Sequence, residues 1–182
     1  MVKVFKLPPT NLPLKTNLVN LCTVRDKTIA KDLGTLGYPK FAYLSTHRKK
    51  NPVTVLFSAL KSDDLESRIV ESLPWIVLTF PELNWKELIN LCKLNDLQNR
   101  LGFITSLALK LAAKYRDQEK IDILSQRESE LSRSRLLRED TLCQNSISET
   151  EKKWLKVHRS REARFWRILS DIKPKHLDYG KS

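Results

Sequence analysis

The feature that most constrains the fold of this chain is an apolar helical repeat between Asn95 and Arg116. Apolar side chains recur there every three or four residues, the spacing that places them on one face of a helix: Leu97, Leu101, Ile104, Ala108, Leu111 and Tyr115. Phe103 and Leu107 widen this face beyond the stripe of a surface helix. We therefore expect a central helix that other elements contact on several sides.

The rest of the chain predicts further helices and almost no strand. Residues typical of helix starts recur at Asn51-Pro52, Asn84-x-x-Glu87, Ser148-x-x-Glu151 and Ser160. Alternating apolar and polar residues between turn signals, the mark of a strand, are nearly absent. The predicted fold class is all-α: a compact multi-helix domain with an N-terminal helix-turn-helix-like unit and a protruding charged helix.

Three regions follow from changes in composition. Residues 1–50 are predicted to be a basic arm and the helix-turn-helix-like unit, residues 51–117 a helical core, and residues 118–182 a charged helix and basic C-terminal helices. Segment 118–138 has only a thin apolar stripe, so we expect a solvated, protruding helix or a connector. A further interpretation is a surface for pairing with a second copy through Glu128, Glu130, Arg133 and Arg135.

The helix-turn-helix hypothesis rests on Lys27–Lys50. Ala30 precedes Gly34 by four residues, and we expect Gly34 to end the first helix through a positive φ. Pro39 then opens a second helix, with Phe41 and Leu44 facing inward and cations along its outer face as far as Lys50. The alternative is two ordinary short helices joined by a glycine, with solvated cations.

Charge is concentrated at the two ends of the chain, within a net charge of +12. Residues 1–62 carry eleven Lys and Arg against two Asp, and residues 125–182 carry fourteen against nine acids. Residues 63–124 are nearly neutral, with eight cations and ten acids. Basic ends around a neutral middle favour a polyanionic partner.

Candidate contacts come from both basic ends. In the helix-turn-helix hypothesis Lys27, Lys31, Lys49 and Lys50 contact phosphates, whereas Thr46 and Arg48, or Lys40 and Tyr43 at the start of the second helix, lie near base edges. The full set of predicted nucleic-acid-binding residues is Arg25, Lys27, Lys31, Lys40, Tyr43, Thr46, Arg48, Lys49, Lys50, Arg159, Arg161 and Arg164.

The second basic element, Glu151–Arg167, interleaves cations with aromatic residues. One interpretation is a nucleic-acid groove that uses stacking and phosphate contacts. The other, which we favour for the large apolar side chains, places Trp154, Leu155, Phe165 and Trp166 on inward faces of two helices. Phosphate contact is retained for Arg159, Arg161 and Arg164.

Signals for catalysis are poor. The four glycines form no phosphate-binding loop, and no Ser or Cys lies in a glycine elbow. The three cysteines lack zinc-site spacing and fit a reduced intracellular setting. We predict no enzyme, no metal and no cofactor. The longest apolar run, Leu73–Phe80, is too short to span a bilayer and no signal peptide is evident, so the predicted location is the cytoplasm, without membrane contact.

Residues 81–108 carry a distant resemblance to a known family. Leu83-Asn84-Trp85 precedes one expected helix, and Arg100-Leu101-Gly102-Phe103 opens the next. This segment resembles the C-terminal helical region of AbiEi-type antitoxins, regulators from bacterial abortive-infection loci. The resemblance implies a bacterial defence or mobile-element setting, in which an N-terminal winged helix binds DNA and represses the antitoxin's own operon. This chain shows no clear wing, and no functional residue is transferred.

The sequence therefore predicts a DNA-binding regulatory protein, a transcriptional repressor or antitoxin of a defence or mobile-element locus. DNA is favoured over RNA as the partner, with a homodimer or a protein partner as additions. The alternative is a non-catalytic helical subunit of a protein or ribonucleoprotein assembly, which binds RNA or a partner through its basic ends.

Overall fold

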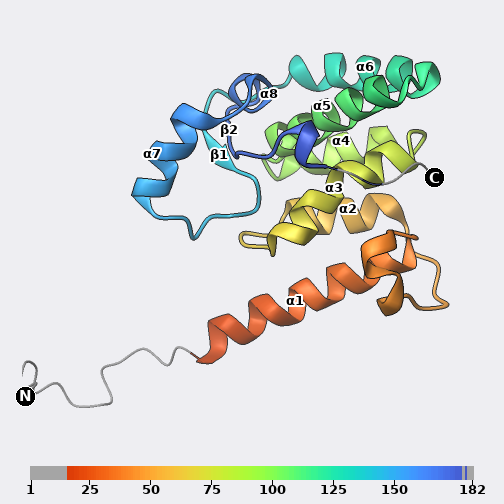
Figure 1. Ribbon diagram of the computed structural model, residues 1–182, viewed down its shortest axis with the longest axis vertical. Helices are drawn as coiled ribbons and strands as arrows, with labels where there is room; N and C mark the ends of the chain where they lie inside the picture. Colours follow the sequence, from red (N-terminus) through yellow and green to blue (C-terminus); the bar gives the residue numbers. More distant parts are fainter. Residues whose placement is uncertain (1–15, 178, 180–182) are drawn as a thin grey trace, which may run out of the picture.

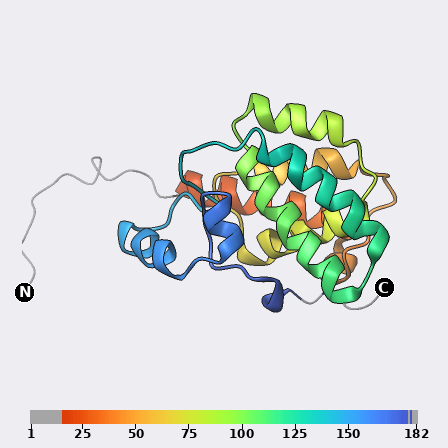
Figure 2. The same cartoon turned by 90° about the horizontal axis from the view of Figure 1, so that it is seen from above.

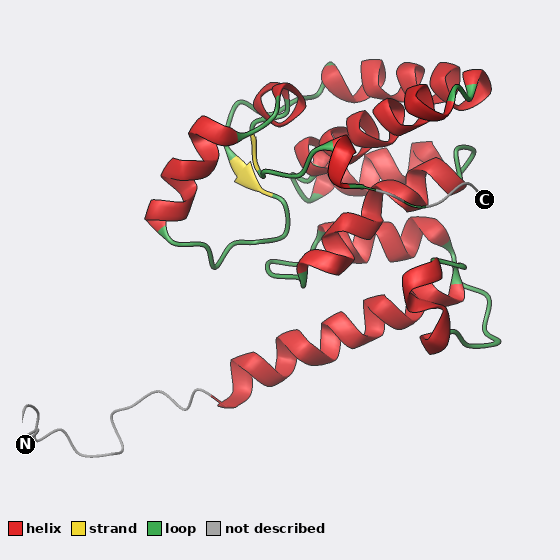
Figure 3. Ribbon diagram, in the orientation of Figure 1, coloured by secondary structure: helices red, strands yellow, loops and turns green. Residues whose placement is uncertain are grey.

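The computed structural model describes residues 16–177 and 179, and within α1 it describes side chains from Arg25 onward. The predicted all-α fold is confirmed, because helices make up most of the described chain (Figure 3). The predicted basic arm at the start of residues 1–50 falls on residues 1–15, which lie outside the described residues. In chain order the elements are α1 Thr16–Thr35, η2 Pro39–Leu44, α2 Pro52–Leu60, α3 Ser67–Thr79, α4 Trp85–Leu94, α5 Gln98–Tyr115, α6 Gln118–Ser132, β1 Asp140–Thr141, α7 Glu149–His158, α8 Arg161–Phe165, β2 Ile168–Leu169 and η3 Pro174–His176.

Helix α5 lies at the centre of the fold, as its sequence predicts. It packs against α3 and α4 and, on another side, against α6 and α8, while α1 lies beyond α2 and α3 (Figure 1). Leu101, Ile104 and Leu111 are fully buried. One continuous apolar core extends from Ile29 to Leu177, so the three regions of the sequence share a core.

The close approach of the C-terminal segment to α5 depends on Gly102. A Cβ atom at this position would lie 2.3 Å from Cζ3 of Trp166, whose side chain is fully buried. The Trp166 indole N–H also donates a hydrogen bond to Oγ of Ser106, one turn further along α5, at 2.6 Å. Trp166 therefore packs directly against Gly102 and Ser106 of α5.

The predicted caps at four helix starts are confirmed. Asn51, Asn84, Ser148 and Ser160 each accept a backbone N–H bond at the start of α2, α4, α7 and α8, and the Ser148–Glu151 capping box is complete. Helix α8 is short and ends at Phe165. Arg167 adopts a left-handed φ of 57°, which turns the chain into β2. This strand pairs in parallel with β1, Asp140 opposite Ile168 and Thr141 opposite Leu169.

The charged helix α6 lies along α5 and does not protrude (Figure 2). Leu124 and Leu131 are fully buried, and Glu128 accepts a hydrogen bond from Ser106 of α5. A thin stripe suffices because α5 offers a long apolar face to it. Of the four side chains expected to pair with a second copy, Glu130 pairs with Arg127 and the Arg135 guanidinium lies over the ring of Phe165, both within this chain, while Arg133 is exposed.

The N-terminal unit differs from the predicted helix-turn-helix, which is not confirmed. Gly34 lies inside α1 and does not end it; a Cβ there would lie 2.1 Å from the Phe41 carbonyl oxygen, so this glycine allows η2 to pack closely. The positive φ belongs to Gly37, at 99°. There the Gly37 and Tyr38 N–H groups donate to the Gly34 and Leu33 carbonyls, as in a Schellman motif. The second helix, η2, is 3₁₀ and ends at Leu44, so residues 45–50 form a loop.

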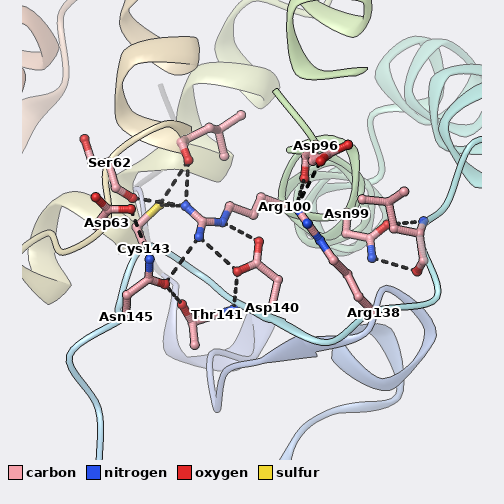
Figure 4. A network of polar contacts seen from close by, with 12 residues as sticks. Ser62, Asp63, Asp96, Asn99, Arg100, Arg138, Asp140, Thr141, Cys143 and Asn145 are labelled. Atoms are coloured by element: carbon pink, nitrogen blue, oxygen red, sulfur yellow. Dashed lines mark hydrogen bonds and ion pairs between the residues drawn. The ribbon is translucent and has the colours of Figure 1, made fainter. Parts of the chain in front are cut away.

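A buried arginine joins three distant segments (Figure 4). The residue Arg100, on α5, is 5% exposed. Its Nε and Nη2 donate to both carboxylate oxygens of Asp140 at 2.8 and 3.0 Å, and Nη1 donates to the Leu60 and Ser62 carbonyls at 2.8 and 3.0 Å. Nη2 also reaches Oδ1 of Asn145 at 3.4 Å. All five guanidinium N–H groups thus have an acceptor, and α5 is tied to the α2–α3 connection and to the loop after β1.

Replacing Gly102 with Ala tests the close packing of Trp166 against α5. Helix propensity alone favours Ala by about 1 kcal/mol. Because the added methyl group overlaps a buried indole, we expect Gly102→Ala to lower the free energy of unfolding by about 1–3 kcal/mol instead. Chemical denaturation followed by far-UV circular dichroism measures the change. A neutral or stabilised variant contradicts this packing.

Removing one charge from the buried Arg100–Asp140 pair tests how much this ion pair stabilises the fold. Asp140→Asn leaves Arg100 without its charge partner, and we expect a loss of about 3–5 kcal/mol in the free energy of unfolding. The matched control is Asp96→Asn, which breaks the exposed Asp96–Arg138 pair (3.5 Å) and should cost less than about 1 kcal/mol. Equal losses in the two variants contradict a structural role for Arg100.

Candidate nucleic-acid interface

Several of the predicted contact residues gather around one hollow of about 790 Å³ between α1 and the loop 45–50. Lys27 and Lys31 lie one turn apart on α1 and so share a face of this helix. Thr46, Arg48 and Lys50 line the opposite wall, which the loop forms. The hollow therefore collects five of the predicted residues.

Two contacts hold the loop against α1. The Thr46 backbone N–H donates to Oγ1 of Thr35 at 3.0 Å, and the two threonine hydroxyls lie 3.1 Å apart. Lys50 forms an ion pair with Asp32 at 2.8 Å. Arg48 lies between these anchors and is exposed. Thr46 and Lys50 thus position the loop, which corrects the prediction that they contact bases and phosphates from a helix.

The hollow has an excess of positive charge. The charged side chains around it are Lys27, Lys31, Arg48 and Lys50 against the single carboxylate of Asp32. Asp32 is already paired with Lys50, and within the described part of the chain no ion pair involves Lys27, Lys31 or Arg48. Three exposed cations with unused donors therefore face the opening, an arrangement suited to phosphate groups.

Other predicted residues at this end lie outside the hollow. Arg25 on α1, Lys40 on η2 and Lys49 in the loop are exposed. Tyr43, at 78% exposure, also projects into solvent from η2. No recognition helix carries these side chains, because η2 spans six residues and buries Phe41. The prediction that Lys40 and Tyr43 begin a longer recognition helix is therefore wrong, and their contact with base edges stays a prediction.

The predicted arginines of the C-terminal region are divided among different contacts. Arg159 pairs with Glu139 at 3.0 Å, and Arg164 donates to the Val157 carbonyl at 3.1 Å, so neither has its full set of donors free for phosphate. A hydrogen bond from Lys156, reinforced by the nearby Arg159, holds the pKa of the Glu139 carboxyl below its usual value. Arg161 is exposed and lines a different hollow, beside Phe165 and Lys110.

Two of the four aromatic and apolar residues expected to face inward are exposed. Leu155 and Trp166 are buried as predicted, but Trp154 is 51% and Phe165 45% exposed. Leu155 is the buried residue of α7, which contacts β2, and the neighbouring Trp154 is exposed. The favoured interpretation of the sequence was wrong for these two residues.

Both cysteines in the described structure are free and buried. Burial raises the pKa of the Cys92 and Cys143 thiols to about 12, which keeps both protonated at neutral pH. Among the residues described, no three His, Cys, Asp or Glu side chains come together as a metal site requires. None of the described helices combines the length and apolar content that crossing a bilayer demands.

Sequence reasoning missed the two residues of α1 that anchor the loop, Asp32 and Thr35. Their partners lie 18 and 11 residues along the chain, respectively, in a segment without regular structure. The one available signal was their spacing, because residues 27, 28, 31, 32 and 35 follow one helical face.

Comparison of this chain with protein-family models, with curated proteins and with solved structures finds no match. The resemblance of residues 81–108 to AbiEi-type antitoxins therefore stays a prediction.

Proposed function

We propose that this protein binds nucleic acid, and DNA in the first place, through phosphate contacts in the hollow between α1 and the loop 45–50. The observation that carries the proposal is the group of Lys27, Lys31 and Arg48, three exposed cations without ion-pair partners in the described chain. A phosphate backbone supplies the repeated negative charges that such a group can neutralise.

The position of the cations favours a role in binding a ligand over a role in solubility alone. The backbone positions of two of them are set by α1, and the third lies on a loop that is held at Thr46 and Lys50. Fixed cations lose less conformational freedom on binding than cations on a loose segment. Because phosphate contacts carry no sequence information, the proposal covers affinity for the backbone. A role as repressor or antitoxin remains a prediction from the sequence.

The test is the salt dependence of binding to a short DNA duplex. The triple variant Lys27→Gln, Lys31→Gln, Arg48→Gln removes three phosphate contacts. We expect weaker binding and a slope of log K against log salt concentration that is shallower by about 2.7. Fluorescence anisotropy of a labelled duplex across a salt series measures both quantities.

The matched control changes the same net charge elsewhere. Lys86, Lys93 and Lys114 are exposed on α4 and α5, and replacing all three with Gln should leave the slope unchanged. Equal weakening of the two triple variants contradicts a defined site, because it shows attraction by net charge alone. Retention by RNA and not by DNA, lost in the first variant, favours the alternative of a ribonucleoprotein subunit.

A further inference from the structure

Helix α7 presents a preformed pair of stacked rings. The Trp154 indole and the His158 imidazole lie with centroids 4.2 Å apart and planes inclined by 15°. Nδ1 of His158 is 2.8 Å from the Trp154 carbonyl oxygen, a hydrogen bond that fixes the imidazole on its own helix. The indole thus lies stacked on an imidazole that is itself held by its own helix.

Half of the Trp154 surface stays open although the imidazole covers one ring face. The open part is therefore the opposite face and the ring edges. Figures 1 and 2 both show α7 at the margin of the molecule, away from α5 and α6. A large aromatic side chain held outward at an exposed margin is not explained by packing, since its burial would stabilise the fold.

The segment that carries the pair is basic. Residues 149–167 carry seven Lys and Arg against three Glu. Lys153, the neighbour of Trp154 on α7, is exposed and takes part in no ion pair within the described chain. A nucleotide supplies both a flat base that can stack on the indole and a negative phosphate for the cations of this segment.

We propose that Trp154, backed by His158, is a stacking platform for an unpaired base of a single-stranded nucleic acid. The inference rests on the proposed function, because it takes the ligand to be a nucleic acid. Bases inside a duplex already stack on their neighbours, so the indole face can take only an unpaired base. A lipid surface is disfavoured because the exposed apolar side chains of α7 are only Trp154 and Val157, too few to bury a helix face.

Tryptophan fluorescence tests the platform directly. The chain has four tryptophans, and Trp75, Trp85 and Trp166 are at most 5% exposed, so a stacked base should quench mainly Trp154. We expect oligothymidylate to quench the emission and Trp154→Ala to weaken its binding by about 5- to 150-fold. Trp154→Phe should retain much of the affinity, and Val157→Ala, an exposed apolar neighbour, should bind as the parent does.

The outcomes separate this inference from the proposed function. If oligothymidylate binds without quenching, and binds Trp154→Ala as well as the parent, the stacking platform is overturned. Weaker duplex binding by the triple variant of Lys27, Lys31 and Arg48 would in that case still support the hollow. Absence of binding to both duplex and single strand overturns both proposals. Binding of anionic vesicles through Trp154, with no quenching by the oligonucleotide, overturns the platform in favour of a lipid surface. Far-UV circular dichroism of each variant confirms that the fold is retained.

Discussion

The ion pair between Arg100 and Asp140 is the interaction on which the C-terminal third of the fold depends. A guanidinium group at 5% exposure is tolerable only if its charge is paired and its donors are filled, and here all five N–H groups have acceptors. These acceptors come from the end of α2, the α2–α3 connection, β1 and the following loop. The pair therefore fixes β1 against the start of α5, and through the pairing of β1 with β2 it fixes the place of α7.

Local features of the sequence predicted those elements whose determinants lie within a few residues. The period of α5 and the caps at Asn51, Asn84 and Ser148 are of this kind. The turn after α1 was misassigned because Gly34 and Gly37 lie three residues apart, and the pattern alone does not tell which one adopts a positive φ. Only the packing of η2 decides, since Phe41 leaves no room for a Cβ at Gly34.

The candidate interface was predictable in its residues but not in its geometry. Charge and spacing in the sequence predicted Lys27, Lys31 and Arg48 as contact residues. Their grouping in space depends on the Thr35–Thr46 and Asp32–Lys50 contacts, which join a helix to an irregular loop. The outward position of Trp154 was not predictable for a related reason. Trp154 and Leu155 are adjacent on α7, so either could face inward, and the choice depends on β2, a two-residue strand formed by distant partners.

Two surfaces on one core thus present different chemistry: exposed cations beside α1 and a stacked aromatic pair on α7. The most direct test of the central claim, that the hollow beside α1 binds phosphate, is a ¹H–¹⁵N correlation spectrum of the assigned protein titrated with a short DNA duplex. We expect shifts concentrated at Lys27, Lys31 and the loop 45–50, and smaller changes on α4. Shifts spread evenly over the surface, or absent from these residues while the duplex binds, contradict phosphate binding in the hollow.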